Sequence, residues 1–331
     1  MTSLAHVTVH RSQFPEQVRH DLLQSLRSRQ VNHKFHYDTL RQIRKWLALH
    51  QACAPSRVDA DCAAIFDHGF TAAAARIAAP KVQLVSLGCG GGRKDARLLQ
   101  ILCRSGKQVS YTPIDVGLAM VLAALQTVRE AMPGIDCSPL VCDLASVEDL
   151  PAILDQFVTE PGPRLLSFLG MIPNFEPQII LPRLSSLVRA EDLLLLSANL
   201  APGPDYAAGL QRILPLYDNA LTRDWLMIFL LDLGIEHRAG KLDFRIEEGS
   251  AAGLKRIAAY FHYTTRQAVI IDDESLEFGA GDSLRLFFSY RHTTAMIHDL
   301  LHPHGLMVLD QWVAPSAEEA VFLVIRQPKA D

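Results

Sequence analysis

The sequence predicts an α/β protein built on a doubly wound, mostly parallel sheet, with a second, smaller α+β domain. An apolar run at 84–87 breaks into four glycines within five residues and then becomes helical, as at the first strand of such a sheet. Further apolar runs of strand length follow, and several end at a polar side chain. The strand pattern stops after residue 198 and resumes near residue 305, which indicates that another region is inserted into the sheet domain.

The glycines form the pattern Gly88-x-Gly90-x-Gly92, where the backbone can approach a ligand closely. A dinucleotide fingerprint, G-x-G-x-x-G, needs its third glycine where this chain has Arg93. The spacing is instead similar to the nucleotide loop of class I methyltransferases, so we expect a Rossmann-like fold that binds S-adenosylmethionine. One departure is Ser86, where those enzymes usually have an acidic residue; a glycine-rich turn without a ligand is the alternative.

Two aspartates follow the next predicted strands. Asp115 ends the strand at 108–114, and its two carboxylate oxygens can accept hydrogen bonds from both hydroxyls of an adenosine ribose. Asp143 ends the strand at 138–142 and can accept from the adenine amino group, while Leu144 covers the ring. The alternative for Asp115 is a simple helix cap.

The fourth strand, 164–169, runs into a loop at 170–175 that contains Asn174. Ligands of open parallel sheets bind beyond the carboxyl ends of the strands, and an asparagine offers both donors and an acceptor there. Asn174 either orients a polar substrate or only shapes the turn after Pro173.

The remaining elements follow from helical spacing and from helix stop signals. We expect helices at 16–29, around 40–47, 59–79, 94–103, 118–131, 210–216, 224–233 and 294–301, and a strand-like run at 267–272. Two last strands, 305–313 and 320–325, are expected to return to the sheet. The predicted domains are 58–198 plus 293–331 for the cofactor, and 1–57 plus 199–292 for the substrate. Aromatic residues of the second domain line a pocket or belong to its core: Tyr217, Trp225, Tyr260, Phe261, Phe287 and Phe288.

Several motifs resemble the histidine-specific Nα-methyltransferases of the ergothioneine pathway, a family that also includes fungal enzymes acting on prenylated tryptophan. The likeness covers most of the chain, through Lys34-Phe35-His36-Tyr37-Asp38, the glycine turn with its Arg-Lys-x-x-x-Leu-Leu continuation, Pro113-Ile114-Asp115, Asp143, Phe168-Leu169-Gly170, Asn174-Phe175 and Tyr217-Asp218. The resemblance implies that Gly88, Lys94, Asp115, Asp143 and Gly170 bind the cofactor, beside Gly90 and Leu144. It also implies that Asn174 and Tyr217 hold the carboxylate of an amino acid.

The chain departs from that family where the substrate side chain is recognised. Members that act on histidine read the imidazole with a Glu-x-Ser pair, and here Phe287 stands at the position of the glutamate, two residues before Ser289. Ala54 replaces a tyrosine, and the loop from Gly170 to Asn174 is one residue shorter than in the family pattern. A phenylalanine cannot hydrogen-bond a ring nitrogen, so histidine is not the expected substrate.

We therefore expect a methyltransferase that N-methylates a small amino-acid-like metabolite. Its polar candidates are Tyr37, Asn174 and Tyr217 as catalytic residues, with Phe287 and Ser289 completing the substrate pocket. A tyrosine or solvent would accept the proton of the amine. The alternative is a protein of the same fold that binds S-adenosylmethionine in a regulatory role, without chemistry.

Composition excludes several partners. The net charge is −4, with 32 basic and 36 acidic residues spread along the chain, which gives no field to attract nucleic acid. The N-terminal residues lack the apolar region of a signal peptide, and no run is long enough to span a bilayer, so we expect a cytoplasmic protein. The histidines at 298, 302 and 304 lack a nearby glutamate base, and we expect no metal.

Overall fold

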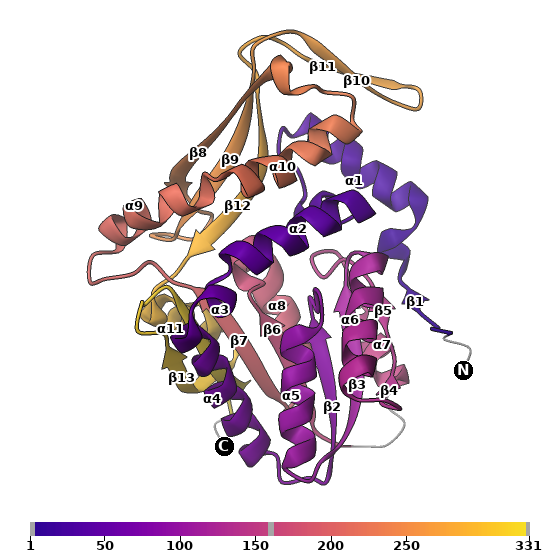
Figure 1. The fold of residues 1–331 in the computed structure, drawn as a ribbon, viewed down its shortest axis with the longest axis vertical. Helices are drawn as coiled ribbons and strands as arrows, with labels where there is room; N and C mark the ends of the chain where they lie inside the picture. Colours follow the sequence, from indigo (N-terminus) through magenta and orange to yellow (C-terminus); the bar gives the residue numbers. More distant parts are fainter. Residues whose placement is uncertain (1–3, 158–161, 329–331) are drawn as a thin grey trace.

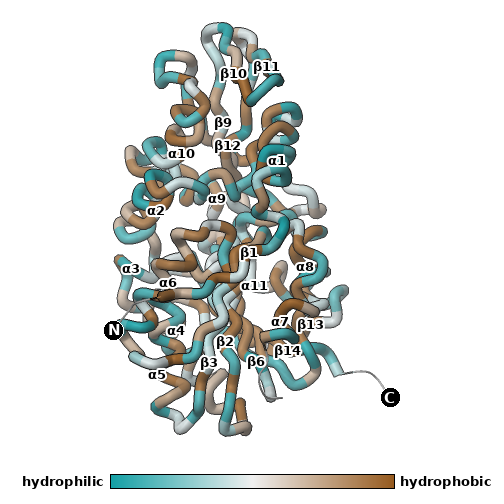
Figure 2. The backbone as a smooth tube through the Cα atoms, turned by 90° about the vertical axis from the view of Figure 1, so that its right-hand side faces the viewer, coloured by the Kyte–Doolittle hydropathy of each residue, from teal (hydrophilic) through white to brown (hydrophobic). Residues whose placement is uncertain are grey.

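The computed structural model describes residues 4–157 and 162–328. Figure 1 shows an elongated molecule with a large sheet in its lower part and a smaller antiparallel sheet above it. Figure 2, turned by 90°, shows the strands β10 and β11 at the upper end and the ends of β2, β3 and β6 at the lower end. The long axis of the molecule therefore runs from one sheet to the other.

The described part of the large sheet has nine strands. Their order is β1-β5-β3-β2-β6-β7-β14-β13, with β4 paired to β3, and the order reverses beside β2, as in a doubly wound fold. All pairs are parallel except β7 with β14 and β14 with β13. The bounds are β1 (Thr8–Val9), β2 (Lys81–Leu87), β3 (Gln108–Asp115), β4 (Asp136–Cys137), β5 (Leu140–Val141), β6 (Arg164–Leu169), β7 (Leu193–Asn199), β13 (Leu306–Val313) and β14 (Glu319–Arg326).

Helices cover both faces of this sheet, so its central strands read as continuous apolar runs. In β7, Leu193 and Leu195 face the layer of α4 and α5, and Leu194 and Leu196 face the layer of α7, α8 and α11. The helices are α4 (Ala60–Arg76), α5 (Arg93–Arg104), α6 (Leu118–Ala131), α7 (Leu150–Gln156), α8 (Pro177–Leu187) and α11 (Thr294–Leu301).

The predicted strand at 138–142 is wrong in its extent. Within this segment β5 (Leu140–Val141) is a strand, and β4 (Asp136–Cys137) precedes the segment, with Pro139 between the two strands. Proline lacks the N–H that a continuous ladder needs. The Pro139 carbonyl instead accepts a hydrogen bond from Thr8 N, which helps to join β1 to β5 at the sheet edge, a pairing that the sequence did not reveal.

The two last strands return to the sheet, as predicted. β14 pairs with β7, and β13 pairs with β14. The helices at 118–131 and 294–301 are confirmed to the residue, and Asp59 caps α4 through the amides of Asp61 and Cys62. The boundaries of the two domains stay a prediction.

The upper sheet is antiparallel, with the order β12-β9-β8. Sequence analysis did not predict these three strands, whereas the run at 267–272 is confirmed as β10 of a hairpin. A β-bulge lies in β12 between Arg285 and Phe287. The bounds are β8 (Gly240–Glu248), β9 (Lys255–Tyr263), β10 (Gln267–Ile271), β11 (Glu274–Phe278) and β12 (Ser283–Arg291), with helices α1 (Pro15–Arg27), α2 (Leu40–Cys53), α9 (Tyr206–Tyr217) and α10 (Ala220–Asp232) around them. The short helix α3 (Pro55–Val58) lies lower in Figure 1, next to α4.

Candidate cofactor and substrate site

A cavity of about 1200 Å³ lies between the two sheets. Its walls are the carboxyl ends of β2, β3 and β6, the segment from α1 to α3, and β12 with α9 and α10. A site for one small molecule measures roughly 300–1,000 Å³, so this cavity has room for a cofactor and a second small molecule. Every residue predicted to be functional lines it: Tyr37, Gly88, Gly90, Lys94, Asp115, Asp143, Leu144, Gly170, Asn174, Tyr217, Phe287 and Ser289.

The glycine turn follows β2 and requires glycine. Gly88, Gly90 and Gly92 have φ values of +79°, +50° and +72°, which L side chains rarely adopt. A Cβ on Gly88 would lie 2.5 Å from the sulfur of Met171, and one on Gly92 would lie 2.7 Å from Cα of Ala124 in α6. The turn thus places its backbone against the cavity and the start of α5 beneath it.

Asp115 is held by backbone amides at the end of β3. Its Oδ2 accepts from Gly90 N at 3.0 Å, and its Oδ1 accepts from Val116 N at 2.8 Å and Gly117 N at 3.3 Å. Burial raises the pKa of this carboxyl, and the three amides oppose that rise. A carboxylate has about four acceptor positions, so one remains for a ribose hydroxyl, where the sequence predicted two such bonds.

A second carboxyl group, that of Asp95, lies near the glycine turn. It is close to Ser86, the position where class I methyltransferases usually have an acidic residue. Asp95, in the first turn of α5, is buried and lines the cavity, and Tyr111 donates to its Oδ2 at 2.6 Å. Burial raises the pKa of Asp95 to about 6. Asp95 was not among the site residues predicted from the sequence. Its carboxyl group and the Ser86 hydroxyl line the same part of the cavity.

The wall formed by the carboxyl ends of β2, β3 and β6, with the loops that follow them, is called the cofactor wall. Asp143 connects this wall to the N-terminal segment. Its amide donates to Ser12 Oγ at 3.0 Å, and its Oδ2 lies 3.7 Å from Nζ of Lys34. Its Oδ1 accepts from Ala145 N, which turns the chain so that Leu144 also faces the cavity. The Lys-Phe-His-Tyr-Asp motif therefore contacts the predicted adenine end of the site.

Two basic side chains mark the opposite corner of the cofactor wall. Nζ of Lys94 lies 3.6 Å from the centre of the Phe66 ring and 3.9 Å from Oε1 of Glu319, and burial lowers its pKa. Arg57, on α3, lowers the pKa of Lys94 further, and its own Nε is buried without a hydrogen-bond partner among the described residues. This corner suits an anionic group.

The loop after β6 carries Asn174, which lines the same cavity as the wall formed by β12, α9 and α10, called the substrate wall. Gly170 N donates to Ser197 Oγ at 2.8 Å, and Asn174 N donates to the carbonyl of Met171, closing a short 3₁₀ turn. Within the described chain the side chain of Asn174 has no hydrogen-bond partner, so both its amide and its oxygen are free for a ligand.

The segment around Tyr37 docks on the bulge of β12. The ring of His36 contacts the carbonyl of Leu286 at 2.7 Å, and Phe288 N donates to Nε2 of His33 at 3.2 Å. Burial lowers the pKa of His36 to about 4, so the ring is neutral and donates to Leu286. A bulge re-aims the side chains that follow it, and here Phe287, Ser289 and Arg291 all line the cavity.

Phe287 lies in an aromatic wall. Its ring stacks on His33 with centroids 4.9 Å apart and meets Trp225 edge-on at 5.5 Å. Trp225 and Phe288 also line the cavity, whereas Phe261 belongs to the core of the upper sheet and Tyr260 donates to Glu247.

The other end of the β12 wall is polar. Tyr217, the last residue of α9, donates to Ser289 Oγ at 2.8 Å and accepts from Nη2 of Arg291 at 2.9 Å. Sequence analysis placed Tyr217 and Ser289 in the site but missed Arg291. Residues 287, 289 and 291 are spaced by two and therefore share one face of a strand, which could have indicated Arg291. The extent of this strand was not predicted from the sequence.

A family model described as histidine-specific methyltransferase, SAM-dependent, matches residues 61–326. The chain belongs to this family. The motif resemblance, the fold class and S-adenosylmethionine as the cofactor are thereby confirmed, and the sheet order given above agrees with them. The individual roles of the site residues stay predictions.

Other known proteins are similar to this family member. The N-methyltransferase imqF of Aspergillus flavus is 22% identical over 240 residues, which cover 70% of this chain and 64% of that protein. The alignment thus spans less than two thirds of that relative's length. Among solved structures, 1,6-didemethyltoxoflavin-N1-methyltransferase from Burkholderia thailandensis is 12% identical, with 86% of this chain and 87% of that chain covered and a TM-score of 0.44. Magnesium protoporphyrin IX methyltransferase from Synechocystis PCC 6803 is 14% identical, with 95% and 100% covered and a TM-score of 0.39.

The described residues contain neither a membrane-spanning helix nor a cluster of metal ligands. No helix among residues 4–157 and 162–328 is long and apolar enough to cross a membrane. The same part of the chain holds no group of three or more His, Cys, Asp or Glu side chains that could bind a metal ion.

Proposed function

We propose that this protein transfers a methyl group from S-adenosylmethionine to the amine of a small amino-acid-like metabolite other than histidine. The observation that carries the proposal is the continuity of the cavity, which joins the glycine turn to Asn174, Tyr217 and Phe287. Family membership supplies the cofactor class, and the N-methyltransferase relative supports nitrogen as the acceptor.

The residues present fit the cofactor. The turn at Gly88, Gly90 and Gly92, which requires glycine, would contact the nucleoside. Asp115 retains an acceptor position for a ribose hydroxyl. The basic corner of Lys94 and Arg57 would hold the methionine carboxylate. When bound, S-adenosylmethionine supplies a methyl group on a positively charged sulfur, a leaving group that is already activated.

The side chains of this cavity have mainly to align the amine and exclude water. Such positioning can lower a barrier by roughly 7 kcal/mol or more. Burial raises the pKa of Tyr37, with a further contribution from the Asp115 carboxylate, so the phenol stays protonated and can donate a hydrogen bond to a ligand. Tyr37 is therefore a positioning donor, and the amine proton leaves to solvent before transfer.

The aromatic wall argues against histidine. Phe287, His33 and Trp225 give an imidazole no carboxylate partner on this wall. Leaving a ring nitrogen unpaired costs roughly 1 to 3 kcal/mol, equivalent to tenfold or more in discrimination. An aromatic or aliphatic side chain suits the wall better.

The test is a screen of amino acids, amines and related metabolites for substrate-dependent formation of S-adenosylhomocysteine from labelled cofactor. We expect turnover with at least one apolar amino acid and at least tenfold lower turnover with histidine. Asp115→Asn should weaken binding of S-adenosylhomocysteine, measured by calorimetry. Tight binding without transfer to any compound would favour a cofactor-binding regulatory protein, and no binding at all would contradict both functions.

A further inference from the structure

Among the described residues, no carboxylate pairs with the charge of Arg291. The residue ends β12, is 8% exposed, and lines the cavity. Its Nη1 donates to the carbonyl of Leu200 and its Nη2 to the hydroxyl of Tyr217, both neutral oxygens. Its Nε is buried and has no partner among the described residues. A guanidinium keeps its charge throughout physiological pH, so a positive charge faces the cavity.

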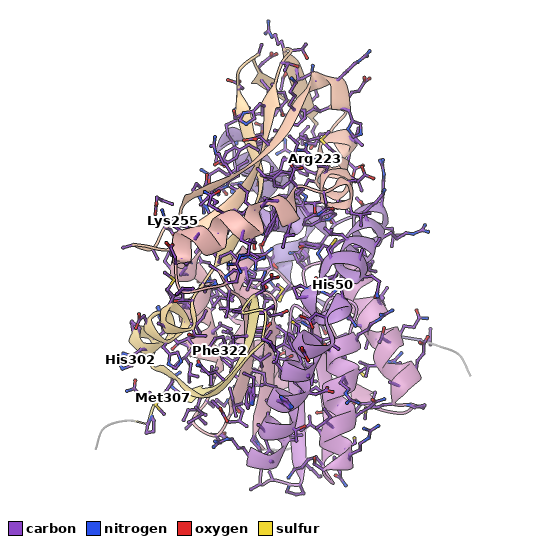
Figure 3. The ribbon with its side chains drawn as sticks, turned by 60° about the vertical axis from the view of Figure 1, so that its left-hand side comes forward. His50, Arg223, Lys255, His302, Met307 and Phe322 are labelled. Atoms are coloured by element: carbon purple, nitrogen blue, oxygen red, sulfur yellow. The ribbon has the colours of Figure 1, made fainter. Side chains whose placement is uncertain are left out.

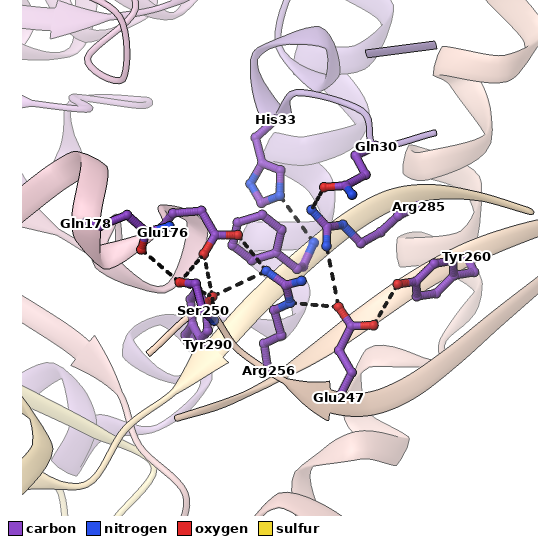
Figure 4. Close-up of polar contacts among 11 residues, drawn as sticks. Gln30, His33, Glu176, Gln178, Glu247, Ser250, Arg256, Tyr260, Arg285 and Tyr290 are labelled. Atoms are coloured by element: carbon purple, nitrogen blue, oxygen red, sulfur yellow. Dashed lines mark hydrogen bonds and ion pairs between the residues drawn. The ribbon is translucent and has the colours of Figure 1, made fainter. Parts of the chain in front are cut away.

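The other buried arginines of the described chain all have carboxylates. Arg164 pairs with Asp192 through two nitrogens. Figure 4 shows Arg256 between Glu176 and Glu247, at 2.6 and 2.7 Å, and Arg285 at 3.5 Å from the same Glu247. No carboxylate of a described residue lies within 4.0 Å of Arg291, which is therefore the exception. Burying a cation without an anion is costly, and such a cost is typical of a site that a ligand completes.

The hydrogen bonds around Arg291 also have a fixed direction. Arg291 donates to Tyr217, and Tyr217 donates to Ser289. The hydroxyl hydrogen of Ser289 is thus not used toward Tyr217 and is available to a ligand. Residues 287, 289 and 291 alternate along the strand and share a face, so this donor lies between Arg291 and the aromatic wall.

We propose that Arg291 and Ser289 bind the carboxylate of the methyl acceptor, with its side chain toward Phe287 and its amine toward Asn174. This replaces the assignment of the carboxylate to Asn174 and Tyr217 that the family resemblance implied, because the Tyr217 hydroxyl already donates to Ser289 and accepts from Arg291. A carboxylate accepts paired hydrogen bonds from a guanidinium, and the free Nε–H of Arg291 offers one donor beside the Ser289 hydroxyl. The inference rests on the proposed function and deepens it, because it names the group that selects the acceptor class.

The experiment compares matched pairs of compounds by calorimetry on protein saturated with S-adenosylhomocysteine. The pairs are L-tryptophan and tryptamine, L-phenylalanine and phenethylamine, and L-leucine and isopentylamine, so each pair differs only in the carboxylate. We expect at least one acid to bind 10-fold or more tightly than its amine. Arg291→Met should abolish that preference while the amine binds as before, and Arg291→Lys should restore part of it.

Two controls separate this result from other causes. Arg223→Met removes the same charge on α10, outside the cavity, in the upper part of the molecule (Figure 3), and should leave the preference intact. Binding of S-adenosylhomocysteine reports that each variant folds. If no acid binds better than its amine, or if the preference survives in Arg291→Met, the inference is wrong. If the preference depends on Arg291 but no methyl group is transferred to any amine, the proposed function fails and the carboxylate site stands.

Discussion

The two walls of the cavity differ in how their charged groups are satisfied. On the cofactor wall, the Asp115 carboxylate accepts from three backbone amides, and Asp95 accepts from Tyr111. On the substrate wall, Arg291 has neutral partners only, and the Asn174 side chain has none among the described residues. The carboxylates of the first wall thus have donors before a ligand binds, although Nε of Arg57 at its basic corner has no partner among the described residues. The second wall leaves a buried guanidinium without a carboxylate, so it depends more strongly on a ligand.

This difference also follows the chain. The cofactor wall is made by residues close to the ends of three neighbouring strands, and its shape depends on local backbone geometry. The substrate wall depends on contacts between distant segments, such as His36 with Leu286, 250 residues apart in sequence. We therefore expect that substitutions at Phe287 change the acceptor preference without altering cofactor binding.

The largest expected effect is on the cofactor wall, with Gly92→Ala. The new Cβ would meet the backbone of Ala124 at 2.7 Å, at a residue whose φ is already +72°. Gly106 has φ +80° but open space around it, so Gly106→Ala carries only the backbone strain, about 1–2 kcal/mol. We expect Gly92→Ala to lower the free energy of unfolding by at least about 2 kcal/mol more than Gly106→Ala does. It should also abolish binding of S-adenosylhomocysteine, measured by calorimetry; equal effects of the two variants would contradict the account of the turn.

An effect smaller than the loss of cofactor binding, about 3 kcal/mol of stability, is expected from the pH dependence of His36, which is fully buried and contacts Leu286 at the bulge of β12. Its pKa is about 4 in the folded protein and about 6.5 in an unfolded chain, so the folded state is favoured above pH 6.5. That stabilisation is lost as the pH falls from 6.5 to 4. His36→Gln should flatten this part of the stability curve, measured by urea unfolding, whereas the exposed His20→Gln should not. Parallel curves for wild type and His36→Gln would show that the ring does not anchor the bulge.

The smallest effect concerns specificity at Phe287. Phe287→Glu puts a carboxylate on the aromatic wall and should weaken binding of apolar amino acids by roughly tenfold, while binding of histidine improves. Phe287→Leu keeps the wall apolar and should leave the order of preference unchanged. Calorimetry with L-phenylalanine and L-histidine measures both. If wild type already prefers histidine, the wall does not select the acceptor.

The sequence predicted the cofactor wall because its signals are local. The glycine spacing, the length of the strands and the position of Asp115 can all be recognised within a window of about thirty residues. The structure places the glycine turn and Asp115 around one cavity. The third strand was mistaken because Pro139 divides it, although the proline was visible.

The substrate wall was harder to predict for a physical reason. Whether an arginine of β9 or β12 is paired depends on which acidic residues fold beside it. Arg256 is paired with Glu247 and Glu176, which come from separate elements, whereas no described carboxylate lies beside Arg291. The bulge at Leu286 leaves no clear sequence pattern, yet it decides which side chains of β12 face the cavity. Tyr217 and Ser289 were found through the family resemblance, and Arg291 only through the structure.

The most direct test of the central claim, that one cavity aligns cofactor and acceptor between these two walls, is a crystal structure with S-adenosylhomocysteine and the best acceptor from the screen. We predict that the ribose lies at Asp115 and the cofactor carboxylate at Lys94 and Arg57. The acceptor carboxylate should lie at Arg291, with its amine facing the cofactor sulfur. An acceptor bound outside this cavity, or one whose amine faces away from the cofactor sulfur, would contradict it.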